Sequence, residues 1–398
     1  MIFSRLGSLL KLGNRGVNAF HTVEDFRKRA KRVLPRMVFD FVDGGAEGEL
    51  SVTANRSALE KVTFAPRYLA NVADRDISTK IFGKPIEVPF IAGPAGLAAL
   101  VHPDGEIGVA KAAKAAGSIF CVSTASCFTL EEIAASSQCR LWFQLYLWKS
   151  SEVVESLVNR AREAGYEALV VTVDVPVVGK RERDLRNGMS LPVRLRAKSV
   201  LDSVLHLPWI WRFLSGPEIT FKNLQGFAEG DDAVSLGEYT DRELTDPSRT
   251  WEDLGVLRRM WKGPLLVKGI MTVEDARAAV DQGVDGIVVS NHGGRQLGSL
   301  PGAATVLPHI ADAVGDRTEL ILDGGIRRGE DIVKAKALGA TASMGGRAWF
   351  WSLAAAGETG VTRLFSILKA DVDRTLALLG ARQFDEVDSN FLFDENAS

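Results

Sequence analysis

Eight short apolar runs follow one another between residues 89 and 344, and each run ends in small or polar residues. Amphipathic stretches of helical length, such as residues 151–164 and 273–282, separate them. Strands that are apolar on both faces are typical of parallel sheets covered by helices. Eight strand–helix units in α/β alternation predict a (β/α)8 TIM barrel, and an open, doubly wound sheet is the alternative. The predicted strands are residues 89–92, 118–122, 141–145, 168–173, 264–267, 286–289, 320–322 and 342–344.

A helical segment precedes the predicted barrel. Residues 21–45 are expected to form one helix, because Thr22 and Asp25 have the spacing of a capping box and an apolar stripe follows them. Residues 1–20 are basic and carry apolar residues at helical spacing. This pattern favours a surface helix or a targeting helix, and a terminal helix packed on the body of the protein is the alternative.

Composition narrows the class of protein. The chain has 398 residues, is 46% hydrophobic and has a net charge of −2, so it lacks the basic surface of a nucleic-acid-binding protein. Cys121, Cys127 and Cys139 have neither metal-site nor disulfide spacing. We therefore expect buried thiols, no metal site and a reducing compartment such as the cytoplasm. The whole chain, residues 1–398, is expected to form one barrel domain.

A long insert interrupts the alternation after the fourth predicted strand. Residues 177–250 are expected to form a lid or binding element, because excursions of this length are seldom plain linkers. The segment 208–214 reads PWIWRFL, and its tryptophans and arginine suit a membrane interface. A lid over the barrel mouth and a contact between subunits are the alternatives for this segment.

The ends of the predicted strands carry the residues that suggest chemistry. In a barrel, loops that follow the strands meet at one mouth. Two glycine pairs, 324–325 and 345–346, are each followed by an arginine, Arg327 and Arg347 respectively. Backbone N–H groups of glycine loops approach a phosphate closely, and arginine adds two-pronged contacts. The two pairs on adjacent strands predict a phosphate-bearing ligand.

The other strand ends carry acid–base groups and cations. His292 is a candidate base and Asp174 is its candidate partner, whose negative charge is expected to raise the pKa of the imidazole. Arg181 and Arg295 form a candidate clamp for a substrate carboxylate. Lys268 lies on a buried strand and needs an anionic partner, which a reduced flavin would provide. Tyr146 is a candidate hydrogen-bond donor to a substrate hydroxyl.

The motifs resemble those of the FMN-dependent 2-hydroxy acid dehydrogenases and oxidases over nearly the whole chain, from about residue 23 to residue 390. The most specific motif is SNHGGRQL at residues 290–297, supported by WFQLY, VTVDVP, LLVKGI, DGGIRRG and GETGV. Within that family, KRERDLRNGMSLP, STAS and PWIWRF look most like the membrane-associated mandelate and lactate dehydrogenases.

The resemblance implies a role for each candidate residue. His292 is the base with Asp174 as its partner, Arg181 and Arg295 bind the substrate carboxylate, and Tyr146 contacts the substrate oxygen. Residues expected near the flavin ring are Ala95, Gly96, Ser123, Gln144, Thr172, Lys268 and Ser290. Residues expected at the ribityl phosphate are Asp323, Gly325, Arg327, Gly346 and Arg347.

Four positions bear on which member of the family this chain resembles. Phe41 replaces a tyrosine that binds the substrate carboxylate, which removes a hydrogen bond worth about 1.5–3 kcal/mol. Ala125 replaces a tryptophan over the substrate and opens the pocket for a bulkier group. Gly298 replaces an aspartate, a change without an explanation in the sequence. Gly96 looks more like the dehydrogenases, whereas alanine is more typical of the oxidases.

The resemblance thus implies an FMN enzyme that oxidises a mandelate-like, lactate-like or bulkier (S)-2-hydroxy acid to the 2-oxo acid. The electrons are expected to pass to a quinone or another acceptor, and an oxidase that reduces O2 to H2O2 is the alternative. It also implies a homo-oligomer, a tetramer by family likeness, in the cytoplasm and at the inner face of the membrane. Two rival hypotheses are a flavin-free barrel for a phosphorylated substrate and a catalytically silent flavin-binding protein.

Overall fold

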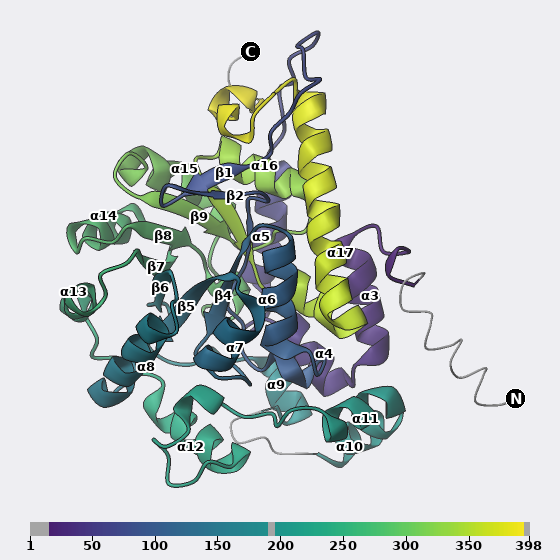
Figure 1. Cartoon of the computed structure of the whole chain (residues 1–398), viewed down its shortest axis with the longest axis vertical. Coiled ribbons are helices and arrows are strands. Elements are labelled where there is room, and N and C mark those ends of the chain that lie inside the picture. The colour runs from purple at the N-terminus through teal and green to yellow at the C-terminus, as the bar shows by residue number, and fades with distance from the viewer. Residues whose placement is uncertain (1–15, 190–195, 394–398) are drawn as a thin grey trace, which may run out of the picture.

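A closed barrel lies at the centre of the computed structural model, which describes residues 16–189 and 196–393 (Figure 1). Its eight parallel strands follow the order β10-β3-β4-β5-β6-β7-β8-β9. They are β3 (Phe90–Ala92), β4 (Ile119–Ser123), β5 (Arg140–Tyr146), β6 (Ala168–Thr172), β7 (Leu265–Ile270), β8 (Gly286–Val289), β9 (Glu319–Asp323) and β10 (Ala342–Gly345). Each predicted apolar run forms one of these strands. The predicted (β/α)8 barrel is therefore confirmed, and the open sheet is wrong.

Helices cover the outside of the barrel, as their apolar stripes require. They are α5 (Leu50–Lys61), α6 (Gly105–Ala115), α7 (Leu130–Ser137), α8 (Ser151–Glu163), α13 (Trp251–Met260), α14 (Val273–Asp281), α15 (Ala303–Val314), α16 (Gly329–Ala337) and α17 (Arg347–Leu379). The long helix α17 bends at Gly357, where a side chain would collide with His102 and Asp104. Glycine is required there because φ is +62° and the space is already filled.

The barrel interior is a packed apolar core and not a pore. Ile91, Trp142 and Met344 are fully buried inside it. The antiparallel hairpin of β1 (Thr79–Ile81) and β2 (Lys84–Ile86) adds Ile81 and Ile86 to the same cluster. These side chains fill the barrel, so ligands are confined to the mouth where the strands end.

Strand register brings polar side chains together at that mouth. Ser123 on β4 pairs with Gln144 on β5, Tyr146 pairs with Thr172 on β6, and Thr172 pairs with Lys268 on β7. These five residues come from four neighbouring strands and lie at or close to their carboxyl ends. Pairing across the parallel sheet therefore assembles a polar rim from residues that are far apart in the sequence.

The helix predicted at residues 21–45 is two helices. They are α3 (Val23–Val33) and α4 (Arg36–Asp43), and the chain between them is extended at Leu34 and Pro35. Proline lacks the N–H that a helix needs and disfavours helical geometry in the preceding residue, so the single-helix prediction was wrong. The predicted capping box of Thr22 and Asp25 is present. Residues 1–15 of the expected surface or targeting helix lie outside the described residues.

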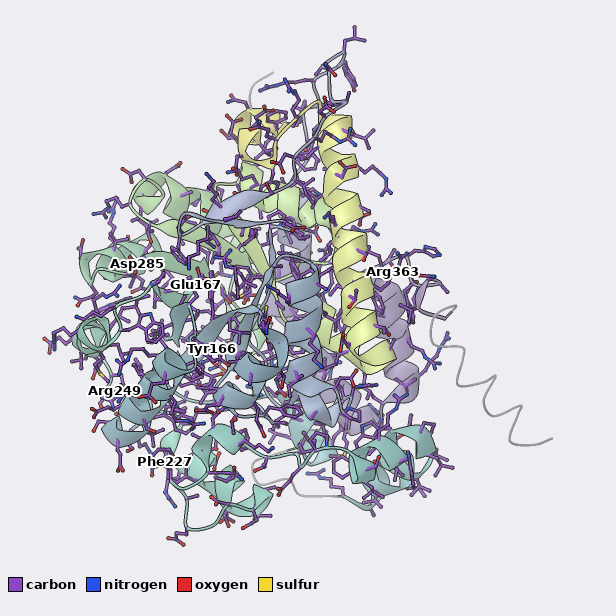
Figure 2. The ribbon with its side chains drawn as sticks, viewed as in Figure 1. Tyr166, Glu167, Phe227, Arg249, Asp285 and Arg363 are labelled. Carbon is purple, nitrogen blue, oxygen red and sulfur yellow. The ribbon has the colours of Figure 1, made fainter. Side chains whose placement is uncertain are left out.

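The insert between β6 and β7 contains α9 (Glu182–Asn187), α10 (Ala197–Val204), α11 (Leu207–Ser215) and α12 (Ala233–Glu243). In Figure 1, α10 and α11 lie side by side beneath α3 and α4. Arg249 secures the far end of the insert, since its Nη2 donates to the carbonyls of Trp148 at 2.6 Å and Lys149 at 3.0 Å (Figure 2). None of the helices among the described residues is both long and apolar enough to cross a bilayer.

Ile91→Ala should destabilise the protein by about 2–5 kcal/mol, because a buried isoleucine inside a closed barrel leaves a cavity that the strands cannot collapse to fill. Urea unfolding measures the change in the free energy of unfolding. The control is Val256→Ala on α13, where the side chain is 45% exposed and the change should stay within about 0.5 kcal/mol. Equal effects of the two substitutions would contradict a packed barrel interior.

Candidate active site

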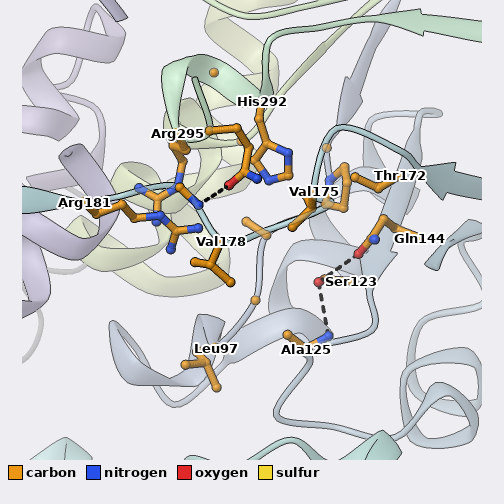
Figure 3. Close-up of a pocket in the computed structure, with 18 of the residues that line it drawn as sticks. Leu97, Ser123, Ala125, Gln144, Thr172, Val175, Val178, Arg181, His292 and Arg295 are labelled. Atoms are coloured by element: carbon orange, nitrogen blue, oxygen red, sulfur yellow. Dashed lines mark hydrogen bonds between the residues drawn. The ribbon is translucent and has the colours of Figure 1, made fainter. Parts of the chain in front are cut away.

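A cavity of about 600 Å³ opens at the carboxyl ends of the barrel strands (Figure 3). It brings together nearly all of the residues singled out from the sequence. Those that line it are Phe41, Ala95, Gly96, Ser123, Ala125, Gln144, Tyr146, Thr172, Arg181, Lys268, His292, Arg295, Asp323, Gly325, Arg327, Gly346 and Arg347. Asp174 and Ser290 lie behind this lining and reach the cavity through His292 and Lys268.

His292 is fixed in position by two contacts. Its Nδ1 lies 2.9 Å from Oδ1 of Asp174, and its backbone N–H donates to Oγ of Ser290 at 3.0 Å. The ring is held by a carboxylate on one nitrogen, which leaves Nε2 free to act as a proton acceptor. A side chain at Gly269 would collide with Asp174, so glycine there gives the carboxylate its room.

The pKa of His292 is lowered overall, although Asp174 raises it as expected from the sequence. Burial lowers this pKa most, and Lys268 and Arg181 add to the effect, so that together they outweigh Asp174. The pKa of Asp174 is itself lowered, since His292 and Lys268 outweigh the opposing effect of burial. The pair is therefore a neutral imidazole beside a carboxylate at neutral pH, which is the form that a general base requires.

Lys268 has a protein partner that the sequence did not indicate. Its Nζ lies 3.0 Å from Oδ2 of Asp323 and donates to Oγ of Ser290 at 3.0 Å. Ser290 in turn donates to Asp323 at 2.8 Å. The pKa of Lys268 is raised, because Asp323 and Asp174 outweigh the opposing effect of burial. Lys268 therefore stays protonated, although the sequence had suggested only a reduced flavin as its anion.

The two arginines of the predicted carboxylate clamp face the same cavity. Nη1 of Arg295 donates to the backbone carbonyls of Phe41 and Gly44, both at 2.8 Å, and its guanidinium lies over the Phe41 ring at 5.5 Å. Phe41 thus orients Arg295 even without a hydroxyl. Nε of Arg181 is buried and has no hydrogen-bond partner among the described residues. Burial and the neighbouring Arg181 and Arg347 lower the pKa of Arg295, which marks a site short of negative charge.

The glycine pairs 324–325 and 345–346 form a concave site with Arg327 and Arg347, which we call the glycine cradle. Gly325 has φ of +82°, and a side chain there would meet the backbone of Asn55. Arg327 lies 4.5 Å from the Trp351 ring, and burial together with Arg347 and Arg56 lowers its pKa to about 9. Such a concave, positively charged site is suited to a phosphate, whose charge would compensate the two arginines.

Buried polar atoms without partners provide a separate test of whether a cofactor fits. Nε2 of Gln144, Oγ1 of Thr172 and Nε of Arg347 are buried and have no hydrogen-bond partner in the described structure. Buried polar groups nearly always have partners, so these atoms point to a polar ligand. Ser123 engages Oε1 of Gln144 at 3.2 Å, which leaves the amide nitrogen for that ligand (Figure 3). A polar ring that ends in a phosphate, as in FMN, matches this set.

Gly298 has a structural reason that the sequence did not reveal. A side chain at this position would collide with the Glu47 side chain and approach the Ala46 carbonyl at 3.3 Å. The backbone of Gly298 accepts a hydrogen bond from Ser51 at 2.9 Å. The loop after α4 therefore packs directly on the loop after β8, and an aspartate would have no room beside the Glu47 carboxylate.

Comparison with known proteins identifies the family. Residues 30–394 match the FMN-dependent dehydrogenase family. The chain belongs to this family. It is 39% identical to (S)-mandelate dehydrogenase of Pseudomonas putida over 94% of each chain, and 40% identical to a peroxisomal (S)-2-hydroxyacid oxidase of Arabidopsis thaliana over 94% of this chain and 96% of that one. The solved structure of the monotopic membrane protein (S)-mandelate dehydrogenase superposes with a TM-score of 0.90 at 39% identity, covering 95% of this chain and all of that one.

Membership makes this protein an FMN-dependent oxidoreductase that acts on the CH–OH group of 2-hydroxy acids. The predicted family, cofactor and reaction class are confirmed, and the flavin-free barrel is wrong. The relatives include both dehydrogenases and oxidases, so the family alone leaves the electron acceptor open.

Several cavity residues were not singled out from the sequence. Most come from the insert and its neighbours, which fold back over the mouth: Trp148, Val178, Asp184, Leu185, Met189, Phe221, Leu224 and Leu244. The apolar ones have no distinctive signal, because an apolar residue in an insert is equally typical of a lid core. Asp184 could have been singled out, because it follows Arg181 by three residues at the start of a short helix.

We expect the acid limb of the kcat/KM profile for a hydroxy acid to have its midpoint below pH 6.5, because the pKa of His292 lies below its ordinary value of 6.5 and the neutral ring is the active base. Steady-state rates between pH 4.5 and 7.0 measure the midpoint. Asp174→Asn removes the contact that raises this pKa, so it should move the midpoint of the acid limb to still lower pH and reduce the maximal kcat/KM. A wild-type midpoint at or above 6.5 would contradict this assignment.

Proposed function

We propose that this enzyme oxidises an (S)-2-hydroxy acid whose side chain is apolar and larger than a methyl group. The observation that carries the proposal is the apolar extension of the cavity beyond Ala125. Lys222 N–H donates to the Ser126 carbonyl at 3.3 Å, which brings the 3-10 turn at Lys222–Leu224 beside the Ala125 loop. The insert lines the same cavity with Phe221, Leu224 and Leu244, together with Thr240 and Asp241, and Trp148 adds a further apolar side chain.

In this proposal Arg181 and Arg295 bind the substrate carboxylate and hold it in one orientation. His292 accepts the proton that the substrate loses as its C–OH becomes a carbonyl, and Asp174 stabilises the resulting imidazolium. Burial raises the pKa of Tyr146 and Asp174 adds to the effect, so its hydroxyl stays protonated and donates to the substrate oxygen. FMN, when bound, supplies the acceptor for two electrons.

The proposed cofactor-binding residues form two groups, one at the flavin ring and one at the phosphate. Gln144, Thr172 and Lys268 would hold the polar edge of the ring, with Ala95, Gly96 and Ser123 beside it. Gly325, Gly346, Arg327 and Arg347 would hold the phosphate. Asp323 pairs with Lys268, so it suits a hydroxyl or ring contact better than a phosphate, which would repel it.

We further propose that the electrons pass to a membrane quinone. Gly96 supports this, because glycine at this position resembles the dehydrogenases of the family. A side chain there would also meet Cβ of Ala125 at 2.6 Å. Reduction of O2 to H2O2 is the second candidate, supported by the 40% identity to a peroxisomal (S)-2-hydroxyacid oxidase.

The hairpin of α10 and α11, which we call the apolar hairpin, supports contact with a membrane surface. Leu205, Trp211 and Leu214 on it are 78%, 74% and 74% exposed. Its inner side is fastened, since Nε1 of Trp209 donates to the Leu100 carbonyl at 2.9 Å. A fastened helix pair with apolar residues outward is suited to lie in the interface of a bilayer. The relative of known structure that is described as a monotopic membrane protein supports the same proposal. The three free thiols are typical of a reducing compartment, so we propose that the enzyme lies at the cytoplasmic face of the membrane.

The purified protein should contain FMN, and (S)-mandelate should bleach it anaerobically faster than L-lactate. An apolar group seated in the extension is worth about 1–3 kcal/mol, so the ratio of kcat/KM should be about tenfold or more. Stopped-flow absorbance of the flavin measures both rates.

Ala125→Trp refills the extension and should reverse that preference. Phe41→Tyr is the matched variant, because its added hydroxyl should strengthen binding of both acids without changing their order. Faster bleaching by L-lactate than by every bulkier acid would overturn the proposed substrate class, and no bleaching by any hydroxy acid would overturn the function.

Trp211→Glu combined with Leu214→Glu should abolish binding to vesicles of phosphatidylethanolamine and phosphatidylglycerol, because two charges would replace the exposed apolar surface of the apolar hairpin. Co-sedimentation measures the bound fraction. The control is Leu378→Glu on α17, which is 71% exposed away from this hairpin and should leave binding unchanged. A wild-type protein that stays in the supernatant would overturn the membrane contact.

A further inference from the structure

Asp184 is an acid inside the cavity that the proposed reaction does not use. It lies in the first turn of α9, three residues after Arg181, and is only 6% exposed. It lines the same cavity as Arg181, Arg295 and His292. A carboxylate placed among the groups that bind the substrate carboxylate needs an explanation, because two anions would then compete for the same cations.

The charges around Asp184 come from three elements. On the side of α4, Asp40 accepts from Nδ2 of Asn187 at 2.8 Å and from Arg36 at 3.4 Å. On α9 itself, Arg183 is directed at other acids, Asp43 at 3.1 Å, Asp40 at 3.6 Å and Glu49. The remaining cations near Asp184 are Arg181, which precedes α9, and Arg295, which follows the 3-10 turn at His292–Gly294.

The pKa of Asp184 lies close to neutral pH. Burial raises its pKa to about 6, Asp40 adds to this effect, and Arg295 and Arg181 oppose it. At neutral pH Asp184 is mostly ionised and offsets part of the charge of the two arginines. Another anion at these arginines would raise the pKa of Asp184 further, because like charges in a buried site disfavour each other's ionised form.

We propose that Asp184 is the resident counter-ion of Arg181 and Arg295, and that the substrate carboxylate enters together with one proton that neutralises Asp184. This inference rests on the proposed function, since it requires a carboxylate to bind at the two arginines. The substrate carboxylate then replaces the Asp184 charge, so the charge of the cavity stays the same. When the product leaves, Asp184 releases the proton and again compensates the arginines.

Uptake of a proton on binding makes the affinity for the carboxylate depend on pH, and this dependence can be measured. Binding that takes up one proton weakens about tenfold per pH unit above the pKa of the group in the free protein. The probe is phenylglyoxylate, a 2-oxo acid that cannot reduce the flavin, titrated into the FMN-loaded protein by flavin absorbance. Its Kd should rise about tenfold per unit between pH 6.5 and 8. Calorimetry at pH 7.5 in two buffers of different ionisation enthalpy should show uptake of close to one proton.

Asp184→Asn is the decisive variant, because a positioning role through charge and a merely structural role give opposite results. If Asp184 competes for the arginines, phenylglyoxylate should bind at pH 7.5 at least about tenfold more tightly than to the wild type, with a Kd independent of pH. If Asp184 only supports α9, binding should weaken. Asp184→Glu should restore the pH dependence.

His292 is the other group whose titration bears on anion binding, so His292→Asn is the matched control. It should keep the slope of Kd against pH. A flat wild-type Kd, a slope lost in His292→Asn, or an Asp184→Asn protein that binds weakly with the slope retained would each overturn the role of Asp184 and leave the proposed function intact. If phenylglyoxylate, pyruvate and oxalate all leave the flavin spectrum unchanged at every pH, both the inference and the proposed carboxylate site are overturned.

Discussion

The concentration of positive charge at the barrel mouth is the constraint on which the rest of the site depends. Arg181, Arg295, Arg327, Arg347 and Lys268 all face one cavity. Burying cations costs free energy unless anions compensate them, and the lowered pKa values of Arg295 and Arg327 are the sign of that cost. The site is thus built to be completed by ligands, with one anion at the glycine cradle and another at the Arg181–Arg295 clamp.

Backbone carbonyls hold these cations in place without neutralising them. Arg295 and Arg347 both donate to the carbonyl of Gly44, where the chain leaves α4, and Arg347 also donates to the carbonyl of Gly293. A carbonyl orients a guanidinium but leaves its full charge for the ligand. Among the described residues, Lys268 is the only one of these five cations in a direct ion pair, with Asp323 at 3.0 Å. The four arginines are therefore available to bind ligand anions, whereas Lys268 is already in an ion pair.

The insert shapes what enters the site. Phe221 and Leu244 line the same cavity as Ala125, which supports the proposed apolar side chain on the substrate. The same insert carries the exposed apolar residues of the apolar hairpin. The insert therefore contains both the residues proposed to select the substrate and the hairpin proposed to contact a membrane.

The sequence by itself determined the barrel and most of the site, because eight buried strands with reactive residues at their ends can close in few ways. The pairing of His292 with Asp174 followed from that order. The sequence also contains Pro35, but the apolar stripe predicted one continuous helix and not the break that this proline makes. The tertiary structure alone decided the partner of Lys268, the direction of the His292 pKa and the reason for Gly298. Each of these depends on burial and on distances between segments far apart in the chain, and the order of the residues does not contain either quantity.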